Sequence, residues 1–319
     1  MIRNLVTGAD GFVGQHLVVE LLRRGEAVVG AVRELPPALT TLSETDAARV
    51  RWTPLDLERP ETVREVIVTH QVDRVFHLAG LSSVTESHAD PVAPLRVNTI
   101  GTLYVLNELA ELRHRRGYDP RVLITGSSQV YGRAASRCRP LTEDSPLEPL
   151  SPYAVSKAAQ EMLGMQFSRA HGLEVVVTRS FNHTGPGQRP TFVAAQLATR
   201  IKEIRSSGGR GTVRVGDPDV RRDFTDVRDV VRAYILLSER GRAGGVYNVC
   251  SGRAYAVGEL LEILAELGGV EVDVQVGHDL RREVDIPEMV GSYARLSDAT
   301  GWIPQIGIRD SLAALLGGV

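Results

Sequence analysis

The fold of this chain is decided by the stretch Thr7-Gly8-Ala9-Asp10-Gly11-Phe12-Val13-Gly14, which joins an apolar strand to an amphipathic helix. Gly8 permits a tight turn, Gly11 lets the backbone approach a pyrophosphate, and Gly14 allows the helix to pack closely on the strand. The backbone N–H groups at the start of the helix, around Phe12 and Val13, then face an anion. The stretch predicts a dinucleotide site, and a glycine-rich turn without a ligand is the alternative.

Short apolar runs and helical patterns alternate along the chain. Strands are predicted at residues 4–7, 27–32, 50–53, 74–78, 122–125 and 174–178. Helices are predicted at residues 11–24, 61–69, 94–116, 152–171, 191–206, 227–240 and 257–267. This alternation is typical of a mainly parallel sheet with helices on both faces. We therefore expect an α/β fold with a Rossmann-type doubly wound parallel sheet.

The character of the chain changes after about residue 180. Turn-forming residues are concentrated at 182–190 and 206–211, and short strands are predicted beyond them, at 212–215, 246–249 and 272–276. We expect a nucleotide-binding domain at 1–180, to which 226–250 returns. The segments 181–225 and 251–319 are expected to form mainly a smaller, interleaved substrate-binding lobe. Ligands of such sheets bind beyond the carboxyl ends of the strands.

The composition argues against several other classes of protein. The 319 residues carry 37 basic and 39 acidic side chains, and a net charge of −2 gives no footprint for nucleic acid or an anionic membrane. No apolar stretch approaches the roughly 18 residues of a membrane helix, and the first residues do not resemble a signal peptide. Cys138 and Cys250 have no metal-ligand spacing. We expect a cytoplasmic protein that binds no metal.

The end of the second predicted strand indicates which dinucleotide binds. An acidic side chain there would hold the ribose hydroxyls of NAD, but Arg33 comes first, and an arginine favours the 2′-phosphate of NADP. NADP(H) is therefore the preferred cofactor, and NAD(H) is a second possibility. The alternative for Arg33 is a solvated surface residue that contacts no cofactor. After the third strand, Asp56 and Leu57 are expected at the adenine. The alternative for Asp56 is the N-cap of the next helix.

The segment Tyr153-Ala154-Val155-Ser156-Lys157 places a phenol and an ammonium one helical turn apart. A phenol has a pKa near 10, and a neighbouring ammonium lowers it, so that Tyr153 exchanges a proton with a substrate oxygen while hydride moves on carbon. Only two of the 37 basic residues are lysines, Lys157 and Lys202. Ser127, at the end of the fifth strand, is expected to hydrogen-bond the same oxygen. A surface pair is the alternative for Tyr153 and Lys157.

Several motifs together resemble the extended short-chain dehydrogenase/reductases that act on nucleotide sugars. They are the three glycines of the first turn, Phe76-His77-Leu78-Ala79-Gly80, Asn98, Ser127 and Tyr153-x-x-x-Lys157. The resemblance covers essentially the whole chain. It implies that Ser127, Tyr153 and Lys157 are catalytic and that Lys157 also bonds the nicotinamide ribose.

The same resemblance implies further roles and a partner. Leu78, Ala79 and Gly80 would line the cofactor, and Asn98 would support a proton relay, with the satisfaction of backbone groups at a helix start as its alternative. A homodimer through the helices at 94–116 and 152–171 is the family arrangement. From the sequence alone, these helices carry only the amphipathic periodicity that packing on the sheet also requires.

The second half of the chain resembles the members that modify GDP-mannose, above all the GDP-4-keto-6-deoxy-D-mannose reductases that make GDP-D-rhamnose. The resemblance lies in 179–188, 215–229 and 246–252. It implies that Asn182 and Arg222 contact the substrate diphosphate, as arginine forks do well. A salt bridge of Arg222 with Asp223 or Asp226 is the alternative.

Two further positions in this half carry weaker expectations. Arg282 and Asp285 match an Arg-Pro-x-Glu element that holds diphosphate and ribose, although Glu283 replaces the proline and Asp285 the glutamate. A charged surface segment is the alternative there. His183 is expected near the nicotinamide or the sugar, and a loop or core histidine is its alternative.

The residue two positions after Ser127 separates two reactions. A 4,6-dehydratase of this family places a carboxylate there to remove the C5 proton, but this chain has Gln129, an amide that is neither acid nor base near pH 7. We therefore expect reduction of the C4 carbonyl of a GDP-4-keto-6-deoxy-hexose, with Ser128 and Gln129 lining the sugar pocket. Dehydration supported by Glu86 or Glu143, C4 epimerisation and a non-enzymatic NADP-sensing protein are the alternatives.

Overall fold

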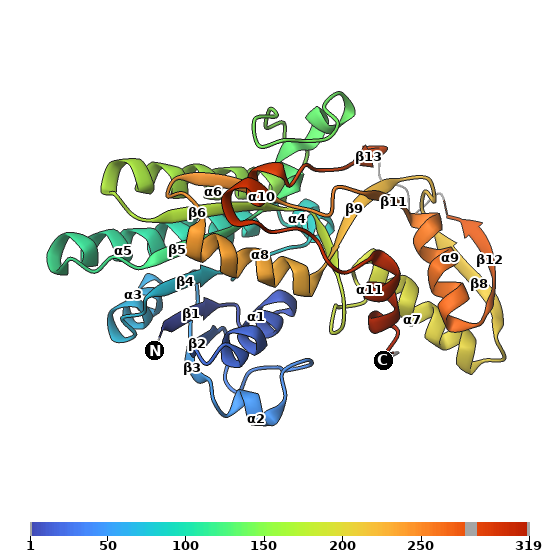
Figure 1. The fold of residues 1–319 in the computed structure, drawn as a ribbon, viewed down its shortest axis with the longest axis horizontal. Helices are drawn as coiled ribbons and strands as arrows, with labels where there is room; N and C mark the ends of the chain where they lie inside the picture. The colour runs from blue at the N-terminus through green and yellow to red at the C-terminus, as the bar shows by residue number, and fades with distance from the viewer. Residues whose placement is uncertain (1, 278–285, 318–319) are drawn as a thin grey trace.

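The computed structural model describes residues 2–277 and 286–317, and its centre is a seven-stranded parallel sheet (Figure 1). The strands run in the order β10-β6-β5-β4-β1-β2-β3, so the order reverses beside β1. Their bounds are β1 Arg3–Thr7, β2 Ala27–Val32, β3 Arg51–Pro54, β4 Arg74–His77, β5 Arg121–Ser127, β6 Val175–Ser180 and β10 Gly245–Val249. This order confirms the expected doubly wound parallel sheet. In such sheets, ligands bind where the strand order reverses.

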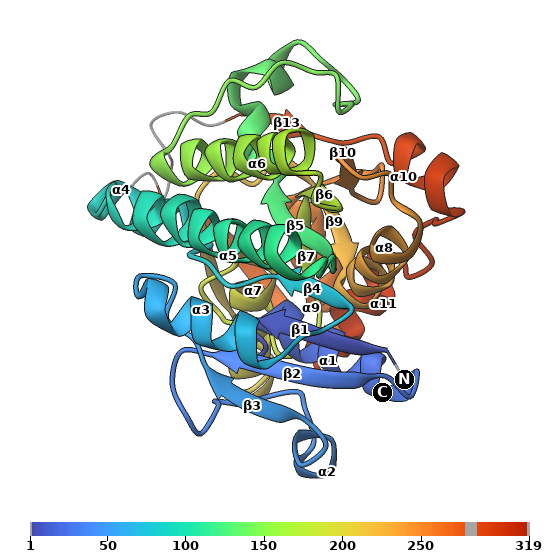
Figure 2. The ribbon, with the colours of Figure 1, turned by 90° about the vertical axis from the view of Figure 1, so that its left-hand side faces the viewer.

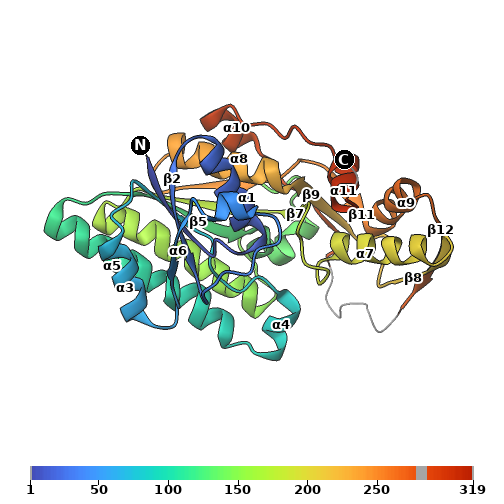
Figure 3. The same cartoon turned by 90° about the horizontal axis from the view of Figure 1, so that it is seen from below.

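Helices cover both faces of the sheet, as Figure 3 shows. On one face lie α1 (Phe12–Arg23), α8 (Val227–Arg240) and α10 (Ala294–Thr300), and on the other α3 (Pro60–Thr69), α5 (Gly101–Arg116) and α6 (Pro152–His171). Each face has its own apolar core, with Leu17, Val231 and Trp302 on the first and Leu106 and Ile124 on the second. Strands buried on both faces explain the continuous apolar runs in the sequence.

The predicted helix at 94–116 differs in its first turn. Residues Leu95–Ile100 form a π-helical turn, η1, and α5 begins only at Gly101. Gly101 lies so close to Leu57 that a Cβ on it would be 2.7 Å from the Leu57 Cβ. The wider turn thus lets the chain pass the buried segment after β3.

A second group of elements lies at one end of the sheet (Figure 1). Its helices are α7 (Val193–Ser206), α9 (Val257–Gly268) and α11 (Ile308–Leu315), and they share an apolar core. Its strands are β7 Asn182–Thr184, β8 Arg210–Val215, β9 Arg221–Asp226, β11 Ala254–Ala256, β12 Glu271–Val276 and β13 Glu288–Met289. The sequence patterns did not predict β7, β9, β11 and β13, because strands of two to six residues with polar side chains have no clear alternation.

One buried carboxylate ties this group of elements to the sheet. Asp223 on β9 accepts hydrogen bonds from the backbone N–H groups of Ser251, Gly252 and Gly291 and from the Ser251 hydroxyl. Strand β9 then runs into α8 at Asp226, whose side chain caps the helix by accepting from the Arg228 N–H. Within the described residues, no helix is both long and apolar enough to cross a membrane.

Candidate active site

The glycine turn after β1 has the shape of an anion cradle. Gly8 has a φ of +68°, and a Cβ there would be 2.9 Å from the Ala79 Cα. A Cβ on Gly14 would be 2.2 Å from the Gly8 carbonyl oxygen, so α1 packs directly on the turn. Gly11 is the N-cap of α1, no side chain caps this end, and the first turn, with Phe12 and Val13, holds no acid. The cradle therefore fits a dinucleotide pyrophosphate.

Strand β7 brings His183 onto this turn. The imidazole stacks on the Phe12 ring, with centroids 6.0 Å apart and planes 12° apart, and its Nδ1 lies 3.1 Å from the Phe181 carbonyl oxygen. Burial lowers the pKa of His183, so the ring is neutral at pH 7. His16 on α1 also contacts this segment, with Nε2 2.8 Å from the Pro186 carbonyl oxygen. The segment after β6 thus forms a wall beside the predicted cofactor site.

Arg33 lies exposed just after β2 and makes no hydrogen bond or ion pair with the described residues. The loop that follows it is held by Gln15, a residue for which the sequence carried no signal. The Gln15 Oε1 accepts from the N–H groups of Thr40 and Thr41 at 2.8 Å, and its Nε2 donates to the Asp10 carbonyl oxygen. This buried amide therefore joins the loop after Arg33 to the glycine turn.

Asp56 and Leu57 follow β3 as expected. The Asp56 carboxylate accepts from the Glu58 N–H at 3.0 Å, but the N-cap of α3 is Arg59. The alternative of a helix N-cap at Asp56 is therefore wrong. Leu57 is buried against Gly101.

Asn98 fastens the segment that follows β4. Its Oδ1 accepts from the Leu81 N–H, and its Nδ2 donates to the Leu81 carbonyl oxygen and to the Ser156 hydroxyl. Asn98 lies inside η1, so it holds a loop and not the start of its own helix. A Cβ on Gly80 would be 2.7 Å from the Asn98 Oδ1 and 3.8 Å from the Lys157 Nζ. Leu78, Ala79 and Gly80 thus lie between the glycine turn and the lysine.

Tyr153 and Lys157 face the sheet in the first two turns of α6. They are only 7% and 6% exposed, so the alternative of a surface pair is wrong. Burial raises the pKa of Tyr153, and a hydrogen bond with Ser127, at the end of β5, opposes that rise. The structure brings these three residues together.

The ammonium of Lys157 bonds groups other than the phenol. It donates to the Thr125 carbonyl oxygen and to the Gln160 Oε1, both at 2.9 Å. Burial lowers the pKa of Lys157 to about 8. The expected lowering of the Tyr153 pKa is therefore not what the geometry produces: the phenol is protonated at neutral pH, and Lys157 is the group that titrates closer to pH 7.

Two further hydroxyls lie beside this group, and the sequence patterns gave no signal for them. The Ser180 hydroxyl on β6 is 2.7 Å from the Tyr234 hydroxyl on α8. Burial raises the pKa of Tyr234 to about 12, and proximity to Tyr153 contributes to that rise. The carboxyl ends of β5 and β6 therefore present uncharged donors at neutral pH.

In the part of the chain that the structure describes, neither carboxylate considered for dehydration forms a hydrogen bond or ion pair with Ser127, Tyr153 or Lys157. Gln129 is half-buried in the turn after Ser127, and Ser128 is buried beside it. Glu143 is buried, accepts from the Asn248 N–H at 2.8 Å and pairs with Arg295 at 3.6 Å. Glu86 is exposed on α4 (Val84–Ala89), where its N–H donates to the Ser83 hydroxyl. Glu143 thus has a structural role in holding β10.

The predicted diphosphate ligands lie on the small sheet. Asn182 on β7 pairs with Phe224 of β9. Arg222 on β9 donates to the Arg221 and Ile286 carbonyl oxygens. Its alternative partners are taken by other groups, because Asp223 accepts from the loop at 251–252 and Asp226 pairs with Arg228. Arg282 and Asp285 lie outside the described residues.

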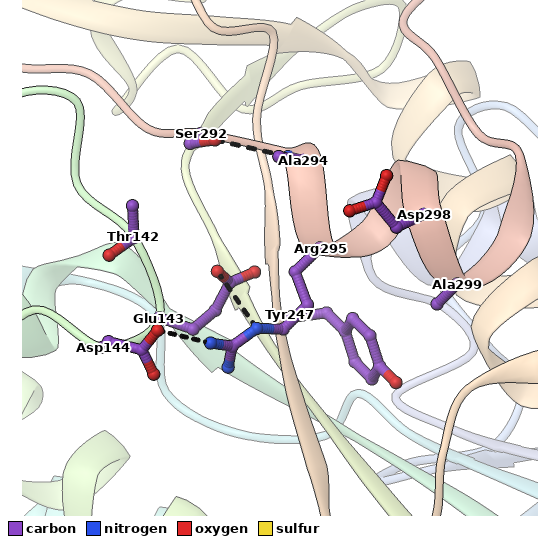
Figure 4. Close-up of a pocket in the computed structure, with 9 residues that line it drawn as sticks. All are labelled: Thr142, Glu143, Asp144, Tyr247, Ser292, Ala294, Arg295, Asp298 and Ala299. Carbon is purple, nitrogen blue, oxygen red and sulfur yellow. Dashed lines mark hydrogen bonds and ion pairs between the residues drawn. The ribbon is translucent and has the colours of Figure 1, made fainter.

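An open cavity of about 500 Å³ lies outside this site (Figure 4). It is bounded by Thr142, Asp144, Tyr247 and Arg295, and the Arg295 guanidinium bridges Glu143 and Asp144. Of the residues considered for the site, only Glu143 lines it.

Known proteins of similar sequence assign the family. Residues 5–315 match the family described as GDP-mannose 4,6 dehydratase. The chain belongs to this family. It is 38% identical over 314 residues to GDP-6-deoxy-D-mannose reductase of Pseudomonas aeruginosa. The aligned residues cover 98% of this chain and 96% of that protein. It is 34% identical to dTDP-glucose 4,6-dehydratase of Streptomyces griseus, over 97% of this chain and 92% of that protein.

A solved structure gives the same assignment. The structure of RMD from Pseudomonas aeruginosa complexed with NADPH matches with a TM-score of 0.83 at 38% identity, covering 99% of this chain and 98% of that one. The resemblance to nucleotide-sugar enzymes drawn from the motifs is therefore confirmed, and the GDP-mannose 4,6-dehydratase family includes this chain.

Proposed function

We propose that the chain reduces the C4 carbonyl of a GDP-4-keto-6-deoxy-hexose, of the type that converts GDP-4-keto-6-deoxy-D-mannose to GDP-D-rhamnose in deoxysugar biosynthesis. The observation that carries the proposal is the buried group of Ser127, Tyr153 and Lys157, with an amide, Gln129, where a dehydratase needs a carboxylate. The 38% identity to a protein named GDP-6-deoxy-D-mannose reductase supports the same reaction.

The chemistry follows from the protonation states of these groups. A reduced nicotinamide cofactor held at the turn of Gly8, Gly11 and Gly14 would supply the hydride that C4 receives. Tyr153 keeps its proton at neutral pH because burial raises its pKa, and it gives that proton to the carbonyl oxygen. Ser127 donates a second hydrogen bond to the oxygen as negative charge develops. Lys157, one helical turn away and charged below a pKa of about 8, stabilises the phenolate that remains.

NADPH is the proposed source of reducing equivalents. The cradle at Gly8, Gly11 and Gly14 fits the pyrophosphate. Arg33 lies exposed directly after β2, and an arginine at that strand end favours a 2′-phosphate. A bound NADPH in the solved relative supports this preference. Use of NADH stays open, because another relative in the family, the UDP-glucose 4-epimerase of Thermus thermophilus, is in complex with NAD.

Dehydration and epimerisation fit the site less well. An elimination across C5 and C6 needs an acid and a base, and Glu143 is held by Asn248 and Arg295. An epimerase would oxidise C4 and then reduce the resulting ketone with the same retained cofactor, so it would consume no added NADPH. We expect this protein instead to take up free NADPH and to release NADP⁺ in each turnover.

We propose a homodimer as the working form. Apolar side chains are exposed on the outer face of α6 and on η1, among them Val155, Met162, Leu95 and Ile100. Figure 2 shows α5 and α6 side by side on one surface of the molecule. Two copies of this helix pair would bury these side chains in a four-helix packing.

The remaining proposals concern organisation and location. Residues 1–180 and 226–250 would bind the cofactor, and 181–225 with 251–319 would form the substrate lobe. We propose a cytoplasmic location, which suits an NADPH-dependent reductase whose Cys138 and Cys250 are free thiols.

The direct test follows absorbance at 340 nm with NADPH and GDP-4-keto-6-deoxy-mannose. We expect substrate-dependent loss of NADPH, and at least about 100-fold slower turnover for Tyr153→Phe with unchanged NADPH affinity. Tyr118→Phe is the matched control, because it removes a half-buried hydroxyl that only bonds the Val72 backbone. Formation of a 4-keto sugar from GDP-mannose by the protein alone would contradict the proposal.

A further inference from the structure

A chain of buried polar groups leads from the predicted catalytic lysine into the sheet. The Lys157 Nζ donates to the Gln160 Oε1 at 2.9 Å, and the Gln160 Nε2 donates to the Thr102 hydroxyl at 2.7 Å. The Thr102 Oγ1 is 2.9 Å from the His77 Nε2, and the His77 Nδ1 is 2.9 Å from the Thr7 Oγ1. Gln160, Thr102 and His77 have no exposed surface, and Thr7 is 1% exposed.

The donors and acceptors of this chain fit only one arrangement of protons. The Thr102 hydroxyl gives its proton to the Asn98 carbonyl oxygen at 2.6 Å, so its oxygen accepts from both Gln160 and His77. The Gln160 NH₂ group must therefore face Thr102, which leaves its oxygen toward Lys157. His77 carries its proton on Nε2, and Nδ1 accepts from Thr7.

The end of this hydrogen-bonded series that is farthest from Lys157 reaches the predicted cofactor site. The Thr7 oxygen accepts from the Ala79 N–H at 3.0 Å, and Thr7 immediately precedes the glycine turn at Gly8. The orientation of the Gln160 amide is thus determined by the strands and the loop that hold the cofactor cradle. A freely rotating amide would have presented either its oxygen or its NH₂ group to the ammonium.

We propose that Gln160 is a positioning residue that holds the ammonium of Lys157 charged and directed at the end of β5, with Thr102 and His77 locking its amide in place. This inference rests on the proposed function, because the charge of Lys157 affects the reaction through the proton transfer of Tyr153. Among the described residues, the amide oxygen is one of two acceptors for this buried ammonium, the other being the Thr125 carbonyl oxygen. An acceptor so placed stabilises the charged form of the lysine.

No other described group near Lys157 offers a negative charge. His77 is neutral, since burial and the nearby ammonium lower its pKa to about 3. Glu161 on the same helix is paired in a fork with Arg179 of β6. Other ionisable groups on the elements that pack against α6 are paired, exposed or partly exposed: Arg96 on η1 pairs with Glu58, Arg121 on β5 with Glu174 and Arg113 on α5 with Asp119, Tyr131 bonds Asn248, Glu86 and His88 on α4, Glu111 and His114 on α5 and Arg133 are exposed, and Glu108 on α5 is half-buried. Tyr153 keeps its proton at neutral pH.

The two-lysine composition allows a direct measurement. Protein labelled with ¹³C at the lysine Cε gives two signals, and Lys202→Arg identifies the signal of Lys157. We expect Gln160→Met to lower the midpoint of the Lys157 titration by about one pH unit, because a hydrogen bond to the charge is lost. Gln160→Glu should raise the midpoint by one unit or more, because a carboxylate replaces the amide oxygen. In the reductase assay, the alkaline limb of kcat should move in the same directions.

Controls keep the outcomes separate. Gln166→Met makes the same change at an exposed position of α6 and should leave the Lys157 midpoint unchanged. If Gln160→Met does not fold, Gln160→Glu alone carries the test. Unchanged midpoints in folded Gln160 variants would overturn the inference, even if the wild type reduces the sugar. The NMR titration needs no substrate, so shifted midpoints in a wild type without reductase activity would support the role of Gln160 and contradict the proposed function.

Discussion

At the scale of single residues, the cofactor preference depends on the side chain of Arg33. The guanidinium is exposed and unpaired within the described chain, whereas nearby Arg49 is bound to Asp46. Gln15 fixes Thr40 and Thr41, in the loop beyond Arg33, to the glycine turn. From the sequence, Arg33 either binds the 2′-phosphate of NADP or is a solvated surface residue. A measurement of cofactor preference decides between these two interpretations.

Replacement of Arg33 by serine is expected to raise the KM for NADPH by roughly 10- to 100-fold, because a charge-assisted contact with the 2′-phosphate is lost. The KM for NADH, which lacks this phosphate, should stay within about threefold. Steady-state kinetics with both cofactors measures the ratio. Equal effects on NADPH and NADH would show that Arg33 does not read the phosphate.

At the scale of elements, the contact between β1, its turn and α1 leaves no room for a side chain. A Cβ on Gly14 would be 2.2 Å from the Gly8 carbonyl oxygen and 2.9 Å from the Ala9 Cα, and both neighbours are backbone atoms. The strand, the turn and the helix must therefore separate if this position is enlarged. The anion cradle consists of the same backbone.

We expect Gly14→Ala to lower the free energy of unfolding by about 1–3 kcal/mol and to weaken NADPH binding at least tenfold. Urea unfolding and fluorescence titration of NADPH measure the two effects. Gly258→Ala in the first turn of α9 is the matched control, because its nearest neighbour would be 3.4 Å away. That variant should be as stable as the wild type or more so. Normal cofactor binding by a folded Gly14→Ala protein would argue against the cradle.

Strand β4 contributes a pH dependence to stability through His77. The folded chain keeps this imidazole neutral, with a pKa of about 3, whereas the unfolded imidazole binds a proton below its ordinary pKa of 6.5. The unfolded state therefore binds more protons between pH 6.5 and 3, and the free energy of unfolding falls as the pH is lowered through this range.

Between pH 7 and pH 5, this contribution is expected to be about 2 kcal/mol. His77→Gln should be less stable at pH 7 but should lose about that much less on acidification, as measured by urea unfolding at the two pH values. His114→Gln, at an exposed position of α5, should leave the pH dependence unchanged. An unaltered pH dependence in His77→Gln would mean that other groups cause it.

At the scale of the whole molecule, α6 serves both the site and the surface. The inner face of α6 carries Tyr153 and Lys157, and its outer face exposes Val155 and Met162, which are 44% and 61% exposed and two turns apart. The proposed dimer interface and the predicted catalytic residues therefore share one helix. Association would restrain α6 from outside while the Glu161–Arg179 pair holds it from inside.

We expect Met162→Glu to shift the protein from dimer to monomer in analytical ultracentrifugation, because a charge would be buried between two copies. The free energy of unfolding of the monomer should change little, since Met162 contacts solvent in the single chain. Val274→Glu, at an exposed apolar position on β12, is the control and should not alter the sedimentation. A wild type that sediments as a monomer would refute the proposed dimer.

The fold and the outline of the site followed from local patterns. Glycine spacing, apolar runs and the Tyr153–Lys157 interval are short-range properties, and backbone geometry translates each of them directly into a turn, a strand or a helix face. The sheet, its helices and the grouping of Ser127 with Tyr153 could be anticipated for this reason. The small strands β7, β9, β11 and β13 could not, because their pairing joins segments far apart in the chain.

Protonation states and the direction of side chains belong to the tertiary structure. The interval from Tyr153 to Lys157 suggested that the ammonium acidifies the phenol, but burial raises the phenol pKa, and the ammonium bonds Thr125 and Gln160 instead. Local spacing cannot reveal this, since desolvation and hydrogen-bond partners depend on residues brought together by folding. Thr7, His77, Thr102 and Gln160 lie on β1, β4, α5 and α6, and only the packing of these four elements makes them one chain of hydrogen bonds.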